Sequence, residues 1–600
     1  MAEEKYETHE YDVVVIGAGG AGLRAAVEAS AQGVRTALVC KSLLGKAHTV
    51  MAEGGIAAAM GNVYPEDNWQ VHFRDTMRGG KLLNNWRMAQ IHAQESPDRV
   101  LELEEWGALF DRTHDGLILQ RDFGGHRYAR LAHVGDRTGL EMIRTLQQHA
   151  VHKGIDVYME CNLQRLLTDA GRISGAFGYW RESGKFILFK CKAVVLATGG
   201  GGKAWKVTSN SWEYTGDGVT MAMDAGADLM DMEFMQFHPT GMVWPPSVRG
   251  ILVTEGVRGD GGTLKNTNNE RFMFNYIPEF FRAETAETEK EADAWYEDKK
   301  SNRRTPDLLP RDEVARAINS EVKAGRGTPH GGVFLDIASR RPSDYIQRRL
   351  PSMYHQFKEL ADVDITKEPM EVGPTCHYSM GGVRVDADST ATTVAGLFAA
   401  GEVAAGLHGA NRLGGNSLSD LLVFGRRAGL YAAEYVKSHT GAVNIDTAHV
   451  DGYAKELLAP FESTGGENPY TVHADLQDCM QNLVGIIRTE SELKNAFEVI
   501  KQLKQRSRNL KVGGNRHYNP GWHLALDLYS LLNFAEAATV AAIERKESRG
   551  GHTRDDYPSP DPKFAKVNIV VRKKDGELTI AQEPLPEMPE ELKSLLEEKK

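Results

Sequence analysis

The chain has 600 residues, of which 41% are hydrophobic and 26% are charged, and its formal net charge is −11. This composition is typical of a globular protein with a large core, and it excludes collagen-like, coiled-coil and wholly disordered chains. The negative charge argues against nucleic acid as the main partner, because a phosphate-binding face needs clustered lysine and arginine.

The chain begins with a pattern typical of a βαβ unit. Residues 11–16 (YDVVVI) and 35–39 (RTALV) are short apolar runs that predict strands, and residues 21–32 between them have helical composition. Two later apolar runs that end in glycine, residues 193–202 and 396–401, predict strands of the same sheet. We therefore expect an α/β fold whose parallel, doubly wound, Rossmann-like sheet is interrupted by an inserted domain.

The later segments have different compositions. Residues 284–304 carry 12 charged side chains among 21, which predicts a solvated helix or excursion of the insertion. Residues 490–508 and 521–548 are long runs of helical composition. Residues 566–581 predict a strand, a turn at Asp575-Gly576 and a second strand.

The chain shows no signal for export or for a membrane span. Residues 1–10 are acidic and polar, unlike a signal peptide, and no apolar stretch reaches the roughly 18 residues that a spanning helix needs. We expect an intracellular protein with free thiols. No C-x-x-C pattern or metal site is indicated by the 5 cysteines, Cys40, Cys161, Cys191, Cys376 and Cys479.

A G-x-G-x-x-G hexad, Gly17-Ala18-Gly19-Gly20-Ala21-Gly22, lies between the first predicted strand and helix. Gly17 permits a tight turn, Gly19 lets the backbone approach a pyrophosphate, and Gly22 lets the helix pack on the strand. This context predicts a dinucleotide site, and the alternative is a flexible glycine turn. Cys40-Lys41-Ser42 stand where a ribose-binding acid is expected, which argues against a standard NAD site.

A flavin explains the other glycine-rich strand ends. Thr198-Gly199 close the predicted strand within residues 193–202, and Glu402 lies just past the one within residues 396–401. Ligands of open α/β sheets bind at the carboxyl ends of the strands, where a carboxylate can accept hydrogen bonds from ribityl hydroxyls.

Longer motifs resemble those of a known family. The chain resembles the flavoprotein subunits of succinate dehydrogenase and fumarate reductase. The order and approximate spacing of the motifs agree over about residues 11–555. The motifs are His48-Thr49-Val50, Ala52-Glu53-Gly54-Gly55, Asp122-Phe123-Gly124-Gly125, Gly216-Asp217-Gly218, Gln236-Phe237-His238-Pro239-Thr240-Gly241, Thr254-Glu255-Gly256-Val257-Arg258-Gly259, Pro310-Arg311-Asp312, His377-Tyr378-Ser379-Met380-Gly381-Gly382, Gly409-Ala410-Asn411-Arg412-Leu413-Gly414 and Arg545-Lys546-Glu547-Ser548-Arg549-Gly550.

The resemblance implies a domain division and a cofactor. It implies a split FAD-binding domain at residues 1–240 and 368–440, an α+β capping domain at 241–367, a helical domain at 445–550 and a small C-terminal segment at 551–600. It also implies FAD bonded covalently to His48. The implied cofactor-binding residues are Gly17, Ala18, Gly19, Gly20, Ala21, Gly22, Lys41, Ser42, His48, Thr49, Gly54, Gly55, Thr198, Gly199, Asp217, Glu402, Arg412, Ser417 and Leu418.

The same resemblance implies a dicarboxylate site. A dicarboxylate carries two negative charges that must be desolvated beside the flavin, so it needs several donors. The implied donors are His238, Thr254, His377 and Arg412, and Phe123 forms an apolar wall. Taken singly, each histidine or arginine has a structural alternative.

For proton transfer, the resemblance implies Arg311 as the acid/base, with Glu255 and Arg258 as its relay. Arginine is an unusual base because its ordinary pKa exceeds 12, and a crowded cationic cluster would disfavour its charged form. The alternative for Arg311 is an ion pair at a helix start with a nearby acid.

The implied activity is oxidation of succinate to fumarate, with hydride transfer to FAD. The implied partners are a membrane anchor that reacts with quinone and an iron–sulfur subunit, which would hold the chain peripherally at the cytoplasmic face of the membrane. The alternatives are fumarate reductase, L-aspartate oxidase and a non-catalytic FAD-binding subunit. L-aspartate oxidases lack the histidine that corresponds to His48. Lys46-Ala47, Met51 and Asp260 depart from residues common in the family.

Overall fold

The strands predicted around the hexad pair in one parallel sheet of the computed structural model, which describes residues 6–597. Consecutive apolar residues make these strands suitable for burial on both faces. The predicted sheet and its interruption by an insertion are confirmed. The strand order is β18 (Leu397–Ala399), β11 (Ala193–Leu196), β2 (Val13–Ile16), β3 (Thr36–Val39) and β7 (Asp156–Tyr158).

Helices and two smaller sheets surround this sheet. The helix that follows the hexad, α1, packs against α11 and α4. The helices are α1 (Gly20–Ala31), α2 (Trp69–Gly79), α3 (Trp86–Glu105), α4 (Thr138–His152), α5 (Asp217–Asp224) and α11 (Asn416–Ser438). The smaller sheets are β1 (Glu7–Glu10), β10 (Phe186–Lys190), β9 (Arg172–Trp180), β8 (Cys161–Asp169), and β4 (Ile56–Ala57), β6 (Leu131–Ala132), β5 (Gln120–Arg121).

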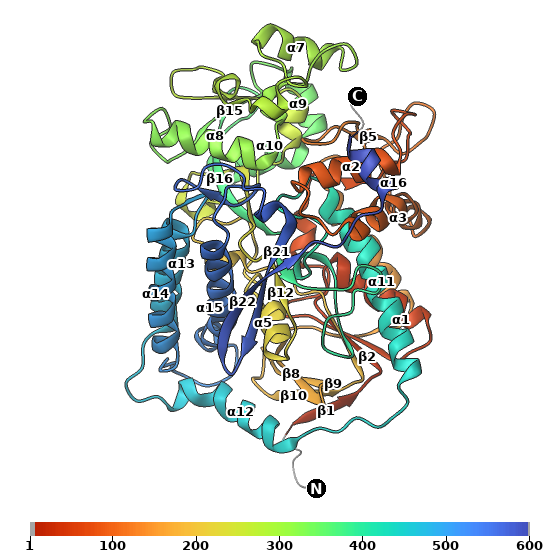
Figure 1. Cartoon of the computed structure of the whole chain (residues 1–600), viewed down its shortest axis with the longest axis vertical. Helices are drawn as coiled ribbons and strands as arrows, with labels where there is room; N and C mark the ends of the chain where they lie inside the picture. The colour runs from red at the N-terminus through yellow and green to blue at the C-terminus, as the bar shows by residue number, and fades with distance from the viewer. Residues whose placement is uncertain (1–5, 598–600) are drawn as a thin grey trace.

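The insertion forms a layer at one end of the molecule, the upper end in Figure 1, and has a hydrophobic core of its own between Met242 and Val372. Its antiparallel sheet runs β13 (Met235–Met242), β16 (Met370–Ser379), β15 (Val333–Asp336) and β14 (Thr263–Lys265). Its helices are α6 (Gly256–Gly259), α7 (Glu289–Glu297), α8 (Arg311–Lys323), α9 (Ser343–Arg349) and α10 (Pro351–Ala361). The solvated helix predicted within residues 284–304 is α7, which buries only Ala292 and Trp295.

Helices from the later part of the chain pack along one side (Figure 1). They are α13 (Pro469–Leu483), α14 (Glu490–Ser507) and α15 (Pro520–Glu544). Helix α12 (Thr447–Glu462) runs across the lower end of the molecule in Figure 1, and α16 (Glu590–Glu597) lies beside α2. The expectation that no apolar stretch reaches spanning length is wrong for α15. Its 25 residues are long and apolar enough to cross a membrane, but 89% of the apolar window is buried within the protein, which is typical of a core helix.

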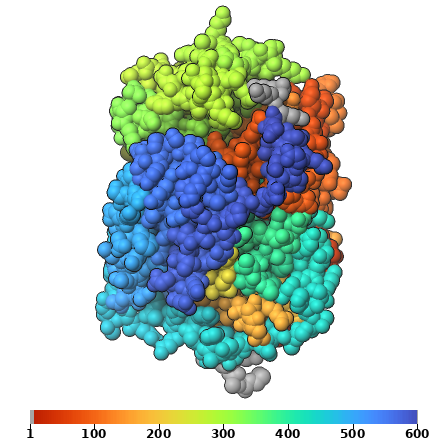
Figure 2. All heavy atoms as spheres, viewed as in Figure 1, coloured from red at the N-terminus to blue at the C-terminus, as the bar shows by residue number. Residues whose placement is uncertain are grey.

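The predicted C-terminal hairpin is confirmed. Asp575 and Gly576 both have positive φ, 52° and 87°, as a tight hairpin turn requires. The hairpin joins strands from earlier in the chain, and Figure 2 shows residues of this end of the chain running over one face of the molecule. The sheet runs β17 (Gly382–Val383), β12 (Leu229–Met230), β21 (Val567–Lys574) and β22 (Glu577–Pro584), and β19 (Ile487–Arg488) pairs with β20 (Thr553–Arg554).

Candidate active site

An elongated cavity of about 380 Å³ lies at the carboxyl ends of the central strands, beneath the inserted layer. Most of the residues predicted to bind cofactor or substrate line it, although they come from distant parts of the chain. They are Gly17, Ala18, Gly19, Gly20, Ala21, Lys41, Ser42, His48, Thr49, Gly54, Gly55, Phe123, Thr198, Gly199, Asp217, His238, Thr254, Glu255, Arg311, His377, Glu402, Arg412, Ser417 and Leu418. Gly22 and Arg258 lie outside its lining.

The glycine hexad has no space for side chains at its two ends. Gly17 has φ +109°, and a Cβ there would be 2.2 Å from the carbonyl oxygen of Ala197. A Cβ at Gly22 would be 1.7 Å from the carbonyl oxygen of Gly17, so close helix–strand packing depends on glycine here. The backbone N–H of Gly20 donates to Thr49 Oγ1 at 3.3 Å. The hexad therefore presents its backbone to a ligand without intervening side chains.

A buried ion network occupies the place where a ribose-binding acid was expected. Lys41 Nζ donates to Asp217 at 2.9 Å, Asp527 at 2.6 Å and Thr215 at 2.9 Å. Burial alone would lower the pKa of Lys41, but the two carboxylates outweigh it and raise the pKa. Asp217 Oδ1 and Thr198 Oγ1 are buried and have no partner within the described residues. They are free to accept from or donate to cofactor hydroxyls.

Glu402 provides an acid beside the glycine-rich end of β11. Its Oε1 accepts from the backbone N–H of Ser379 at 3.0 Å, and a Cβ on Gly200 would be 2.4 Å from the same atom. Burial raises the pKa of Glu402 to about 7. Glu402, the hexad and the unpartnered oxygens of Asp217 and Thr198 together form a polar cradle, and this cradle fits FAD.

His48 lies between the cradle and the far end of the cavity. It begins a short 3₁₀ turn (His48–Met51), its ring meets Tyr214 edge-to-face at 4.7 Å, and its Nδ1 accepts from the backbone N–H of Ser211 at 3.3 Å. Burial and, to a smaller extent, Lys203 lower its pKa to about 4. The imidazole is therefore neutral at pH 7, with its Nε2 directed away from this hydrogen bond.

Gln236 joins two arginines at the other end of the cavity. Its Oε1 accepts from Arg412 Nη2 at 2.9 Å and from Arg311 Nη1 at 3.3 Å, and its Nε2 donates to the carbonyl oxygen of Arg412 at 2.7 Å. The Arg412 guanidinium lies 4.1 Å from the Tyr378 ring centroid, and its Nε has no partner within the described residues. Burial, followed by the charge of Arg311, lowers the pKa of Arg412 to about 10.

The three residues predicted to move a proton lie together. Arg311 Nε donates to Glu255 Oε2 at 2.9 Å, and Arg258 Nη2 lies 4.0 Å from the same oxygen. Burial would raise the pKa of Glu255, but Arg311 and Arg258 together outweigh it and lower the pKa. Burial and the charge of Arg311 lower the pKa of Arg258, despite Glu255. Arg311 begins α8, but its partner is 56 positions away rather than a neighbouring acid.

Two histidines and a phenylalanine complete this end. The rings of His238 and His377 meet at 5.2 Å, and burial followed by nearby arginines lowers both pKa values well below the ordinary value. Phe123 is 2% exposed and lies against Gly54 and Gly414, at both of which a Cβ would clash with its ring. Thr254 Oγ1 accepts from the backbone N–H of Gly256 at 3.2 Å.

Sequence analysis missed three residues that organise the site. Gln236 begins the quoted motif at residues 236–241, so its position was visible but its bridging role was not. Ser209, whose Oγ lies 2.7 Å from His377 Nδ1, and Asp527, the partner of Lys41, belong to none of the quoted motifs. Only tertiary structure brings them to the cavity.

Known protein families, relatives and solved structures match the chain over most of its length. Residues 12–418 match the FAD binding domain family, and residues 473–594 match the fumarate reductase flavoprotein C-terminal family. The chain is 43% identical to a fumarate reductase (CoM/CoB) chain of Methanothermobacter marburgensis, over 94% of this chain and 98% of that one. It is 38% identical to the succinate dehydrogenase flavoprotein subunit of Coxiella burnetii, over 92% of each chain. A solved Mycobacterium smegmatis Sdh1 in complex with UQ1 is 59% identical, with a TM-score of 0.84 over 97% of this chain and 95% of that one.

Proposed function

This chain belongs to the succinate dehydrogenase and fumarate reductase flavoprotein family, and we propose that it is the catalytic subunit of a succinate dehydrogenase, oxidising succinate to fumarate. FAD is its cofactor, in keeping with the matched FAD binding domain. A non-catalytic role is disfavoured, because the cavity retains its full set of arginines and histidines around Gln236.

One observation carries the proposal. Three buried guanidiniums, those of Arg258, Arg311 and Arg412, gather at this end of the cavity, and the carboxylate of Glu255 is ion-paired with the first two. These four side chains therefore hold an excess of two positive charges, which matches the two negative charges of a dicarboxylate. Such an excess is costly in a buried site unless an anion neutralises it.

The side chains have different roles in the proposed reaction. Bound FAD supplies a hydride acceptor. Arg412 holds a carboxylate through its planar fork, with His238, His377 and Thr254 as further donors. Arg311 gives its Nε proton to Glu255 as it takes the proton from the carbon next to the one that loses hydride, and Glu255 passes a proton on toward Arg258. On either side of Arg311, burial and the charge of Arg311 lower the pKa values of Arg412 and Arg258.

We further propose that FAD is bonded covalently to His48, because its neutral imidazole, with Nδ1 occupied by the Ser211 N–H, keeps Nε2 for the bond. The protein is denatured in acid and run on a gel. Flavin fluorescence should stay with the wild-type band and be lost in His48→Ser, which still binds FAD loosely. A denatured wild-type band without flavin contradicts the bond.

The electrons are proposed to leave through an iron–sulfur subunit, then through a membrane anchor that reacts with quinone, with this chain peripheral at the cytoplasmic face. The similarity to an Sdh1 solved in complex with UQ1 supports a quinone-linked complex. The second candidate is fumarate reduction, which the 43% identity to a fumarate reductase chain favours.

Rates in both directions separate the candidates. The purified complex is assayed for succinate-dependent dye reduction and for fumarate-dependent oxidation of reduced dye, with malonate titrated against the flavin absorbance. We expect succinate oxidation and malonate binding. Faster fumarate reduction would favour the second candidate, and inactivity in both assays would contradict both.

A further inference from the structure

The motif that begins at Arg545 is not part of the cavity, yet it is buried. We call residues 545–552 the brace segment. It follows α15 directly, and Arg545, Glu547 and His552 are 0% exposed. Burying this many charged side chains is costly unless each is paired, so their partners indicate what the segment holds in place.

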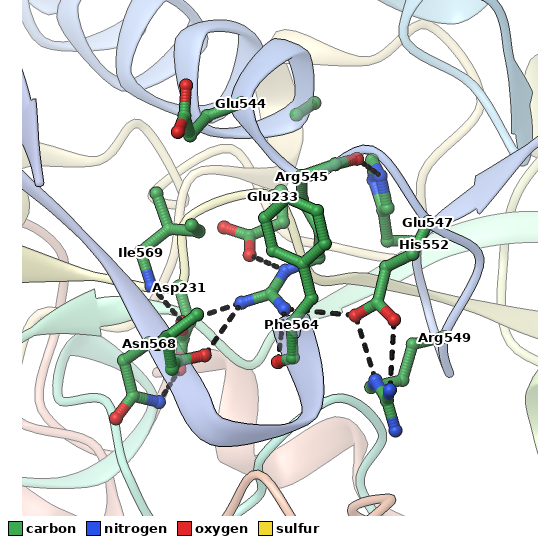
Figure 3. A network of polar contacts seen from close by, with 12 residues as sticks. Asp231, Glu233, Glu544, Arg545, Glu547, Arg549, His552, Phe564, Asn568 and Ile569 are labelled. Carbon is green, nitrogen blue, oxygen red and sulfur yellow. Dashed lines mark hydrogen bonds and ion pairs between the residues drawn. The ribbon is translucent and has the colours of Figure 1, made fainter. Parts of the chain in front are cut away.

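The first half of the segment holds the start of β13. Arg545 Nε donates to Glu233 Oε1, and its Nη2 donates to Asp231 Oδ1 at 3.4 Å (Figure 3). The Arg545 guanidinium also lies 4.8 Å from the Phe234 ring centroid. These partners stand immediately before Met235, the first residue of the strand that carries Gln236 and His238.

The second half of the segment lies against the loop that carries Arg412. The backbone N–H of Gly551 donates to the carbonyl oxygen of Ala410 at 2.8 Å. A Cβ on Gly551 would be 2.9 Å from the carbonyl oxygen of Met235, and one on Gly550 would be 2.3 Å from the carbonyl oxygen of Ala410. Two glycines thus let the segment touch both active-site elements.

A third contact reaches α8, the helix that begins at Arg311. Arg316 Nη1 donates to the carbonyl oxygen of Gly550 at 3.1 Å. On the same helix, Asp312 Oδ1 accepts from Asn411 Nδ2 at 3.1 Å, next to Arg412. The brace segment is therefore joined to each of the three elements that supply Gln236, Arg412 and Arg311.

We propose that the brace segment is a positioning device for the dicarboxylate site, with Gly551 as its contact to both β13 and the loop of Arg412, and Arg316 as its tie to α8. Gln236 bonds to both Arg311 and Arg412, so a shift of β13 relative to the loop of Arg412 changes the spacing of the two guanidiniums. A misplacement of about 1 Å in a binding geometry can cost up to 10²-fold in rate. This inference rests on the proposed function only for the identity of the ligand.

Gly551→Ala in the assembled complex tests the proposal, with Gly513→Ala as the matched control. The new methyl group meets Met235 O and Met380 Cε at 551, whereas nothing lies within 4 Å at 513. We expect malonate affinity and the KM for succinate to worsen about tenfold in Gly551→Ala, with FAD content unchanged. Hydrogen exchange over residues 408–416 should be faster than in the control.

The two readouts separate the proposals. If the wild-type complex binds no malonate, the proposed function fails, and hydrogen exchange alone decides the role of the brace segment. If Gly551→Ala does not fold, Arg316→Gln replaces it and should change malonate affinity and exchange in the same direction. The proposal is overturned if malonate affinity in the variant is within twofold of the control. Where the wild type does not bind malonate, it is overturned if hydrogen exchange over residues 408–416 equals that of the control.

Discussion

Arg545 and Arg412 are both buried, but their nitrogen atoms are paired to different degrees. All three side-chain nitrogens of Arg545 donate to partners, among them the carboxylates of Asp231, Glu233 and Glu547 (Figure 3). Arg412 Nε has no hydrogen-bond partner within the described residues, and neither do Nε and Nη2 of Arg258, whose Nη2 has only the 4.0 Å ion pair with Glu255. We call the Arg545 cluster complete because every nitrogen of its guanidinium is paired, although Glu233 Oε2 has no hydrogen bond within the described residues. The other cluster has donors left over.

This difference separates structural from functional burial of charge. Removing one partner of a complete buried cluster leaves uncompensated charge, which destabilises the fold. Removing one guanidinium from a cluster of like charges relieves repulsion, so its cost should appear in ligand binding or turnover instead. Substitutions in the two clusters should therefore change different measurements.

The largest effect is expected for Arg311→Gln. Glutamine cannot transfer a proton, and loss of a general acid/base costs about 10²–10⁴-fold in turnover, equivalent to about 3–5.5 kcal/mol. Glu255 keeps the Gly124 N–H as a donor at 2.6 Å, so the fold and flavin content should survive. Turnover is measured beside malonate titration of the flavin absorbance. A variant within a few-fold of wild-type turnover would place the proton transfer on another group, such as His238 or His377.

Substitutions in the complete cluster around Arg545 should lower the stability of the fold. Arg545→Met removes the cation that pairs with Glu233 and Asp231, whereas Glu547 keeps Arg549. Breaking a buried ion pair costs about 3–5 kcal/mol. Thermal unfolding is compared with Arg282→Met, which removes an exposed pair with Glu279 and should cost at most about 1 kcal/mol. Equal midpoints for the two variants would show that the cluster does not stabilise the fold.

Sequence patterns predicted the local features well. The sheet strands were visible as apolar runs that end in glycine, and the C-terminal hairpin was visible at Asp575-Gly576. The predicted end of α15 was less accurate, because helical composition continues to residue 548 whereas the helix ends at Glu544. Arg545 instead turns toward buried carboxylates, so tertiary pairing decides where the helix stops.

The pairing within the site could not be predicted from spacing. Arg311 and Glu255 are 56 positions apart, and Arg545 and Glu233 are 312 apart. Motif resemblance implied the first set of residues but not that Gln236 bridges Arg311 and Arg412. Such contacts depend on the order of strands and on the insertion, which local patterns do not contain.

Substitutions in the cluster around Arg412, which has unpaired donors, should change ligand affinity. Arg412→Gln removes one charged donor of the carboxylate, worth about 1.5–3 kcal/mol, or roughly 10- to 150-fold in affinity for succinate and malonate. Because the variant also relieves repulsion with Arg311, the thermal midpoint of the ligand-free protein should not fall as it does in Arg545→Met. Unchanged malonate affinity would remove Arg412 from the binding site.

The smallest effect concerns the pH dependence of the complete cluster. Burial, with a smaller contribution from Asp231, raises the pKa of Glu233 to about 7 despite Arg545. An unfolded glutamate titrates near pH 4.3. The folded state therefore binds the proton more tightly between these values, and the resulting stability is fully present below about pH 4.3 and is lost as the pH rises through about 7.

Glu233→Gln isolates this contribution, because the amide keeps the shape of the side chain but does not titrate. One unit of raised pKa corresponds to about 1.4 kcal/mol, so the thermal midpoint of the wild type should fall, relative to the variant, as the pH rises from 5 to 8. Other groups titrate in both proteins, and the difference between the two curves removes their contribution. Parallel curves would mean that Glu233 is ionised throughout and that Arg545 alone compensates its charge. A difference that grows toward high pH would instead place the proton on Glu233, as its burial beside Asp231 predicts.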